Sequence, residues 1–268
     1  MIRRAVVSGM FYPFSKDSLE RMLSNLFSGT KEGEFRCVIS PHAGYEYSGK
    51  TAAFAISSLK PSKTFVILGP NHNAIGSEFS IMTSGEWETP LGNVKINSEL
   101  ANDIKKSGVI HEDEFAHIHE HSIEVQLPFL QYRFKSFQMV PISITNLDYS
   151  EEFLKKCETL GKHIAKTIRN KPISVIASSD FSHYLPRETA EEKDRKAIEK
   201  IRKLDTKGFF RVLEEIDASV CGFGPIAVVM HVAKELGLKK VEVINHTDSG
   251  DATGDNSSVV AYYAIGFR

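Results

Sequence analysis

The sequence predicts a single-domain α/β fold in which one central mixed β-sheet carries helices on both faces. Short apolar runs rich in Val and Ile alternate with helix-like segments along the chain, which is the pattern of strand–helix–strand crossover connections. The length of 268 residues suits one large domain. No internal repeat, low-complexity segment or Pro/Ser-rich linker divides the chain, so we expect one domain over residues 1–268.

The expected strands are short runs of apolar and β-branched residues that are bounded by turn-forming residues. Pro141 lies inside one of them, and we expect that strand at an edge or a bulge because proline cannot donate a ladder hydrogen bond. The run that follows Pro90 indicates an edge strand or one arm of a hairpin. In chain order the expected strands are residues 36–40, 64–68, 79–83, 91–96, 137–144, 173–177, 241–245 and 259–267.

The expected helices have apolar residues at helical spacing or a clear start signal. Ser98 and Ser150 are typical N-cap residues, and Pro225 is typical of the first position of a helix. Pro128 should kink the helix that contains it. The charge-rich helix at 189–203 is expected to present a solvated face. In chain order the expected helices are residues 50–59, 98–107, 121–134, 150–169, 189–203, 206–216 and 225–236.

The charge balance argues against nucleic-acid and membrane partners. Lys and Arg total 33, Asp and Glu total 34, and no basic stripe stands out, so the net charge is only −1. No apolar run approaches the roughly 20 residues that span a bilayer. The first residues also lack the apolar stretch of a signal peptide. We therefore expect a cytoplasmic protein.

The cysteines give no sign of a disulfide framework. There are three of them, Cys37, Cys157 and Cys221, and they are far apart in the sequence. None forms a C-x-x-C pair, which also argues against a zinc ribbon. We expect all of them to be small core residues.

Polar residues directly follow four of the predicted strands. In open α/β sheets the ligand crevice lies outside the carboxyl ends of the strands, where loops from distant parts of the sequence meet. One histidine after one strand is more often a loop residue, but several such ends in one chain favour a shared pocket. The residues that we expect to be neighbours there are His42, His72, Asp180, His183, His246 and Asp251.

A second group of histidines lies between His117 and His121, where the predicted helix at 121–134 begins. Helical spacing puts His121 and Glu124 on one face, and we expect both at the edge of the pocket. A solvent-facing loop is the favoured interpretation for the earlier histidines. Asn71, which precedes His72, is expected to line the pocket. Tyr12 and Tyr45 are either further lining residues or core aromatics.

These residue types indicate a metal site, but they do not distinguish an oxygenase from a hydrolase. Two histidines and a carboxylate with open positions form the ligand set of non-haem Fe(II) oxygenases. Zinc hydrolases use similar ligands around an activated water molecule. Imidazole also suits copper and nickel.

The order of short motifs resembles that of the Memo-like family, also described as protein B of the AmmeMemoRadiSam system. The matching segments are GMFYP at 9–13, PHAGYEYSG at 41–49, LGPNH at 68–72, WETPLG at 87–92, EHSIEVQLPFL at 120–130, SSDFSHY at 178–184, CGFGP at 221–225 and DNSSVVAYYAIG at 255–266. They span nearly the whole chain. The resemblance implies a fold like that of the class III extradiol ring-cleaving dioxygenases, with a metal pocket in a similar position.

The resemblance also implies roles for single residues. His42 and His72 match the two metal-binding histidines, and His183 matches an acid/base histidine, with Asp180 as a further pocket residue that orients it or a ligand. Animal members are expected to carry a cysteine before the last strand. The stretch SGDATGDNSS has none there, so Asp251, or Asp255 as the alternative, is predicted to be the third ligand. Cys221 belongs to a different motif and is not expected to fill this position.

The function that follows is a dioxygenase-like redox enzyme that acts on a small molecule through a divalent metal. Fe(II) is the expected ion, with zinc or copper as alternatives. Two rival hypotheses remain at this point. One is a module that binds a phosphorylated or carboxylated short peptide in the same pocket without catalysis, and the other is a metal-dependent hydrolase.

Overall fold

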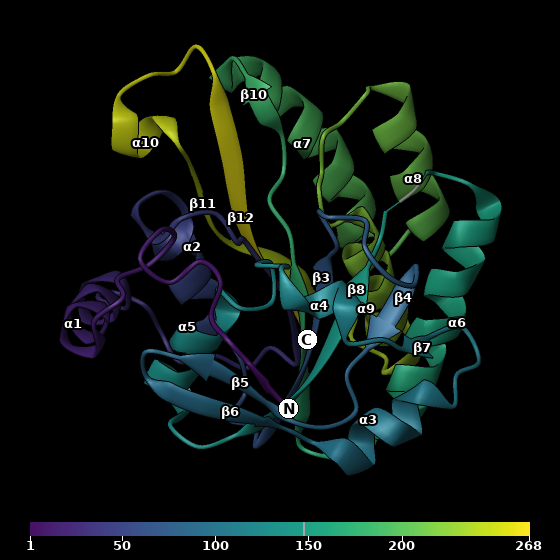
Figure 1. The fold of residues 1–268 in the computed structure, drawn as a ribbon. Helices are drawn as coiled ribbons and strands as arrows, with labels where there is room; N and C mark the ends of the chain where they lie inside the picture. The colour runs from purple at the N-terminus through teal and green to yellow at the C-terminus, as the bar shows by residue number, and fades with distance from the viewer. Residues whose placement is uncertain (147) are drawn as a thin grey trace.

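The computed structural model describes residues 1–146 and 148–268, and this part of the chain contains one 12-stranded mixed sheet (Figure 1). The strands are β1 (Ile2–Arg3), β2 (Cys37–Ser40), β3 (Thr64–Pro70), β4 (Phe79–Ile81), β5 (Glu86–Thr89), β6 (Gly92–Ile96), β7 (His111–Glu112), β8 (Gln138–Ile144), β9 (Ile173–Ser178), β10 (His183–Leu185), β11 (Val241–Asp248) and β12 (Val259–Phe267). Their order is β1–β5–β6–β8–β3–β9–β2–β12–β10, with β11 beside β12, β4 beside β8 and β7 beside β4.

The centre of the sheet is parallel. Strands β8, β3, β9 and β2 are parallel neighbours, and Val66 of β3 is paired with both Val140 and Val175. Strand β12 runs antiparallel to β2, and β11 runs antiparallel to β12. Parallel strands that are covered on both faces are continuous apolar runs, and β3 and β9 are accordingly buried at every position. The predicted fold class, an α/β fold with a central mixed sheet, is confirmed.

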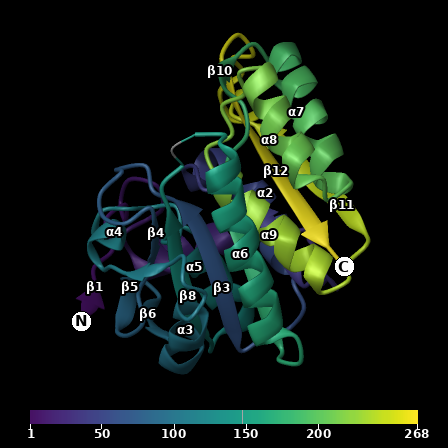
Figure 2. The ribbon, with the colours of Figure 1, turned by 90° about the vertical axis from the view of Figure 1, so that its right-hand side faces the viewer.

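Helices cover both faces of this sheet (Figure 2). They are α1 (Lys16–Leu26), α2 (Tyr45–Ser57), α3 (Ser98–Lys105), α4 (Phe115–Ile118), α5 (Gln126–Phe134), α6 (Glu151–Ile168), α7 (Arg187–Arg202), α8 (Thr206–Glu215), α9 (Phe223–Glu235) and α10 (Gly250–Thr253). Helices α6 and α9 pack together, with α9 against β9 and β3, while α2 and α5 pack together on the opposite face, with α2 against β2 and β12. Among the described helices, none is both long and apolar enough to cross a membrane.

Two prolines that were expected to disturb their elements do not do so. Pro141 was placed at an edge or a bulge, yet β8 lies inside the sheet and Pro141 pairs in regular register with Ile67. On its other side, β6 pairs with β8 up to Met139 and β4 pairs from Ile142 onward, so the missing N–H falls between two partner strands. Pro128 was expected to kink a helix, but α5 begins only at Gln126. Pro128 therefore lies in the first turn, where backbone N–H groups have no partner within the helix.

Strand β11 is longer than predicted, which removes one candidate from the pocket. The sequence placed its end at residue 245, whereas the strand continues to Asp248. His246 therefore lies inside the strand, where its ring stacks on that of Tyr263 with 4.1 Å between centroids. The expectation that His246 follows the strand and joins the other polar residues is wrong.

Candidate metal centre

The carboxyl ends of β2, β3 and β9 meet at one edge of the sheet. Ser40 and Ser178, the last residues of β2 and β9, are paired with each other in parallel register. His42, His72 and Asp180 each follow one of these strands by two residues. Parallel strand ends thus bring together side chains that are far apart in the sequence, as expected from the apolar runs.

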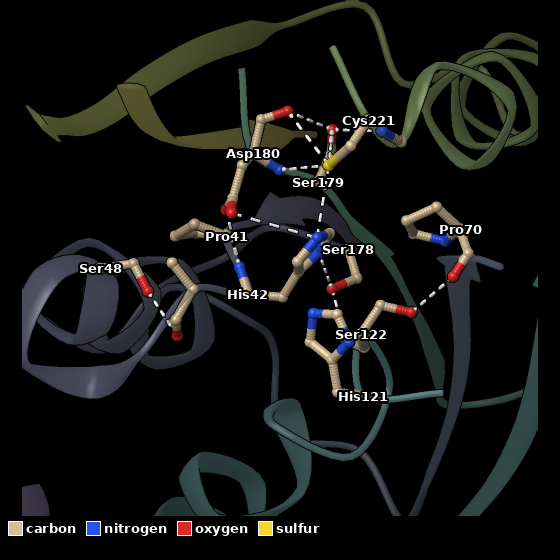
Figure 3. Close-up of polar contacts among 12 residues, drawn as sticks. Pro41, His42, Ser48, Pro70, His121, Ser122, Ser178, Ser179, Asp180 and Cys221 are labelled. Atoms are coloured by element: carbon tan, nitrogen blue, oxygen red, sulfur yellow. Dashed lines mark hydrogen bonds and ion pairs between the residues drawn. The ribbon is translucent and has the colours of Figure 1, made fainter. Parts of the chain in front are cut away.

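His42, His72 and Cys221 form a group of potential metal ligands at this edge. One ligand atom of each lies within 4.8 Å of those of the other two. The rings of His42 and His72 are 5.2 Å apart between centroids and nearly perpendicular, and Nε2 of His42 lies 3.3 Å from Sγ of Cys221. Figure 3 shows His42 between Cys221 on one side and Ser178 on the other. The structure thus brings the two predicted histidines together, and the third member of the group is a cysteine.

Cys221 reaches this place because a glycine follows it. The residue lies just before α9, and the N–H of Gly222 donates to Oγ of Ser179 at 3.0 Å. A Cβ atom at Gly222 would lie 2.5 Å from the carbonyl oxygen of Ser178, so only glycine permits this approach to the end of β9. Cys221 also accepts a hydrogen bond on Sγ from the N–H of Asp180 at 3.2 Å.

Burial sets the protonation of this group. Burial, followed by the charges of the neighbouring His72, His121 and His183, lowers the pKa of His42 well below its usual range. Burial also raises the pKa of the Cys221 thiol well above its usual range. His42 is therefore neutral at physiological pH, as a metal ligand must be. A metal that binds Cys221 must displace its proton.

Glu120 orients His72. Its Oε1 lies 3.0 Å from Nδ1 of His72, and its Oε2 accepts from the backbone N–H of the same residue at 2.6 Å. The N–H groups of His121 and Ser122 also donate to Oε1, at 2.9 and 2.8 Å. Burial alone would raise the pKa of Glu120, but the hydrogen bond from His72 and the nearby imidazoles lower it to about 2.

A second potential group consists of His72, Glu120 and His121. Because Oε1 of Glu120 already has three hydrogen-bonding neighbours, we assign this carboxylate to the support of His72 and not to a metal. The ring of His121 stacks on that of His72 with 4.8 Å between centroids, and it meets Phe11 edge-on at 4.9 Å. His121 therefore lies beside the ligand group, between His72 and Phe11.

Asp180 and His183 lie next to this group. Oδ1 of Asp180 accepts from the backbone N–H of His42 at 2.9 Å, and Oδ2 lies 4.0 Å from Nε2 of His42. Burial raises the pKa of Asp180 to about 6, although the hydrogen bond from the backbone of His42 acts in the opposite direction. His183 is fixed by Ser219, whose carbonyl oxygen lies 2.7 Å from Nδ1. A carbonyl oxygen only accepts, so Nδ1 is the donor and, in the neutral ring, Nε2 keeps its lone pair.

Asp251 is not part of this centre, and its prediction as the third ligand is corrected. Its Oδ1 pairs with Nη2 of Arg187 at 2.7 Å, and its Oδ2 accepts from the N–H of Asp248 at 3.1 Å. The side chain is 51% exposed in α10 and belongs to neither ligand group. The alternative, Asp255, is exposed and accepts hydrogen bonds from Ser257 in its own loop. Both carboxylates are thus engaged by hydrogen bonds outside the ligand group, Asp251 with the distant Arg187 and Asp255 within its own loop.

Glu124 and Tyr12 share a buried hydrogen bond, and the buried ring of Tyr45 lies beside that of Tyr12. Glu124 pairs with Arg3 and accepts from the N–H of Val6 and from the hydroxyl of Tyr12, the latter at 2.6 Å. The hydroxyl of Tyr45 donates to the carbonyl of Val125 at 2.7 Å. Tyr12 and Tyr45 are both buried, as expected for core aromatics.

Asn71 shapes the loop that carries His72. Its side-chain amide donates to the carbonyl of Ile75 at 2.8 Å, and its Oδ1 accepts from the N–H of Asn73 at 3.2 Å. The residue is buried. Its polar atoms are thus engaged within its own loop.

Asp194 is a buried carboxyl group that sequence reasoning missed, because the helix around it is rich in charges. It lies in α7 and is fully buried, and its Oδ1 accepts from the N–H and the hydroxyl of Ser182 at 3.2 and 2.7 Å. Within the described part of the chain, Oδ2 has no hydrogen-bond partner. Burial raises the pKa of Asp194 to about 7. Asp194 thereby anchors the loop between Asp180 and His183.

This raised pKa predicts a pH-dependent cost of folding. The folded state holds this proton more tightly than the unfolded chain, so Asp194 contributes a loss of stability as the pH rises from about 4 to about 7. Asp194→Asn cannot ionise, and its free energy of unfolding relative to wild type should increase by about 2–3 kcal/mol between pH 5 and pH 7.5. Urea unfolding at both pH values measures this, with Glu191→Gln on the exposed side of α7 as the control. A difference that does not change with pH would contradict a raised pKa at Asp194.

Comparisons with known proteins agree with the motifs in the sequence. The family model described as Memo-like protein matches residues 3–266. The chain is 42% identical to a MEMO1 family protein of Methanosarcina barkeri, over 98% of this chain and 99% of the relative. It is 43% identical to one of Sulfurisphaera tokodaii, over 100% and 99%. Among solved structures, an uncharacterized protein of Escherichia coli K12 has a TM-score of 0.52 at 11% identity, over 87% of this chain and 99% of that chain, which supports the fold alone.

Proposed function

The chain belongs to the Memo-like family, and we propose that it binds one transition-metal ion through His42, His72 and Cys221 for redox chemistry on a small molecule. The observation that carries this proposal is the convergence of the three ligand atoms within 4.8 Å at the carboxyl edge of the sheet. His42 is neutral, and Glu120 and Ser178 are in contact with the Nδ1 atoms of the two imidazoles. Such support of the second ring nitrogen is typical of metal-binding histidines.

The donor set suits iron, copper or zinc. Two imidazoles and one thiolate carry the same charge as the two-histidine, one-carboxylate set of Fe(II) oxygenases, and on this ground we propose iron as the resident ion. Thiolate is a softer ligand than carboxylate, so zinc and copper are the expected competitors. When bound, such an ion supplies a redox-active Lewis acid with positions open to a small molecule.

His183 and Asp180 would act on protons beside this centre. With Nδ1 of His183 bonded to the carbonyl of Ser219, its Nε2 can take a proton from a substrate hydroxyl group and return it. Asp180 holds the backbone of His42 through Oδ1. We assign His183 as the general acid/base and Asp180 as a positioning residue.

Isothermal titration of tag-free protein with Fe(II) under anaerobic conditions tests the proposal. We expect one ion per chain in the wild type. Asp251→Ala should bind with affinity within about twofold of wild type, because surface ion pairs such as its pair with Arg187 contribute little. Absence of stoichiometric binding by the wild type to iron, zinc and copper alike would contradict the proposal and favour a module that binds peptides without a metal. A tenfold loss in Asp251→Ala would restore the carboxylate as a ligand.

A further inference from the structure

We propose that Ser178 and Gln126 are positioning residues that hold His42 in the tautomer with its proton on Nδ1. In this tautomer Nε2 carries a free lone pair and faces Cys221. The inference rests on the proposed metal centre, which it deepens by naming the side chains that prepare one ligand. Both side chains are fully buried next to His42.

The carbonyl oxygen of Pro41 fixes the orientation of the Gln126 side chain. Gln126 is fully buried at the start of α5, and its Nε2 lies 2.8 Å from the carbonyl oxygen of Pro41. That oxygen can only accept a hydrogen bond, so the NH₂ group of the amide must face it. The second hydrogen of the same NH₂ group then points at Oγ of Ser178, at 2.9 Å. Gln126 is therefore a donor to Ser178.

The hydroxyl proton of Ser178 points to the carbonyl oxygen of Ser122. Besides Gln126, its Oγ has two neighbours, the carbonyl oxygen of Ser122 at 2.6 Å and Nδ1 of His42 at 2.9 Å (Figure 3). The carbonyl only accepts and is the nearer of the two, so the single hydroxyl proton points to Ser122. One lone pair of Oγ is already used by Gln126. The remaining lone pair can only accept from His42, which means that Nδ1 carries the proton.

A proton on Nδ1 determines which nitrogen of His42 is free to bind a metal. In the neutral ring only one nitrogen is protonated, so a proton on Nδ1 leaves Nε2 with its lone pair. Nε2 is the atom that lies 3.3 Å from Sγ of Cys221. His42 is only 3% exposed, so bulk water has little access to take the place of Ser178 at Nδ1. Without Ser178 the proton can move to Nε2, where it blocks the lone pair that a metal needs.

The chain offers a matched control for this role. Ser143 in β8 is fully buried, like Ser178 in β9, but its hydroxyl has no hydrogen-bond partner within the described residues. Ser178→Ala and Ser143→Ala therefore remove the same group from the same kind of strand. Only the first change removes an acceptor from His42. Ser178→Thr keeps a hydroxyl at this position and tests whether the hydroxyl alone is needed.

Long-range ¹H–¹⁵N correlation spectra of the metal-free protein report the tautomer of His42 directly, and titration with Zn(II) reports affinity. We expect the Nδ1–H pattern in the wild type, in Ser143→Ala and in Ser178→Thr. Ser178→Ala should lose that pattern and bind Zn(II) about 10–100-fold more weakly. Circular dichroism checks that each variant is folded.

An Nε2–H pattern in the wild type would overturn the inference, as would a folded Ser178→Ala that keeps both the pattern and the affinity of the wild type. If Ser178→Ala does not fold, the spectrum of the wild type and that of Ser178→Thr still decide the question. The two proposals fail separately. A wild type that binds no metal contradicts the proposed function, whereas the tautomer of its His42 is measured without any metal.

Discussion

Replacing His42 with alanine, or Cys221 with alanine, should lower metal affinity by about 100-fold or more. Each change removes one of the three ligand atoms in the proposed set. Four ligands together contribute about 10–16 kcal/mol to structural zinc sites, which is about 3 kcal/mol for each ligand and corresponds to about 10²-fold in affinity. Titration with Fe(II) and with Zn(II) measures the effect. At metal concentrations that saturate the wild type, neither variant should bind one ion per chain.

Two control variants separate loss of a ligand from general damage. Cys157→Ala removes a buried free cysteine from α6, and His111→Ala removes an exposed histidine from β7. Both should bind metal as the wild type does. Wild-type affinity in Cys221→Ala would remove this residue from the ligand set, and equal losses in all four variants would point to misfolding.

Glu124→Ala should lower the free energy of unfolding by about 3–5 kcal/mol, the cost of breaking a buried ion pair. The side chains of Arg3 and Glu124 are 2% and 0% exposed. The change leaves the guanidinium group of Arg3 buried without a counter-charge. It also takes the acceptor away from the N–H of Val6 and the hydroxyl of Tyr12. Urea unfolding measures the loss.

A neighbouring ion pair supplies the control for this prediction. Arg4 pairs with Glu88 at 2.8 Å, but the side chain of Arg4 is 76% exposed. Glu88→Ala should therefore change the free energy of unfolding by less than about 1 kcal/mol. Equal effects of Glu124→Ala and Glu88→Ala would contradict the assigned burial of the first pair.

The ion pair between Arg3 and Glu124 is also connected to the candidate metal centre. Arg3 donates to the backbone carbonyls of His117 and Glu120, so it ties the N-terminal segment to the loop that carries Glu120. Glu120 in turn orients His72. A chain of hydrogen bonds thereby links the folding of the first residues to the orientation of His72, one of the proposed ligands.

The part of the site that follows strand ends could be predicted from the sequence. His42 and His72 each come directly after an apolar run, and the edge at which parallel strands end is fixed by the topology. The central strands could be predicted for the same reason, because full burial produces continuous apolar runs. The position of β8 was misjudged, since the sequence does not show that the N–H missing at Pro141 falls between two partner strands.

Cys221 could not be predicted from its spacing. It follows no strand, and it reaches His42 only through the close approach of Gly222 to the end of β9. Asp251 and Asp255 were predicted as ligands because they precede the last strand. Asp251 instead pairs with Arg187, which is distant in the sequence, and Asp255 accepts from Ser257 in its own loop. The spacing of apolar residues does not indicate either contact. The burial of Asp194 could not be predicted for a related reason. One buried carboxylate in a helix rich in charged residues does not change the pattern of apolar and polar positions.

X-ray absorption of the wild type loaded with one equivalent of Zn(II) tests the assignment of His42, His72 and Cys221 most directly, with zinc as the probe ion. We expect one sulfur scatterer at about 2.3 Å and imidazole nitrogens at about 2.0–2.1 Å, with the sulfur scatterer absent from Cys221→Ala. A fully loaded wild-type protein with only nitrogen and oxygen neighbours around zinc would contradict this ligand set.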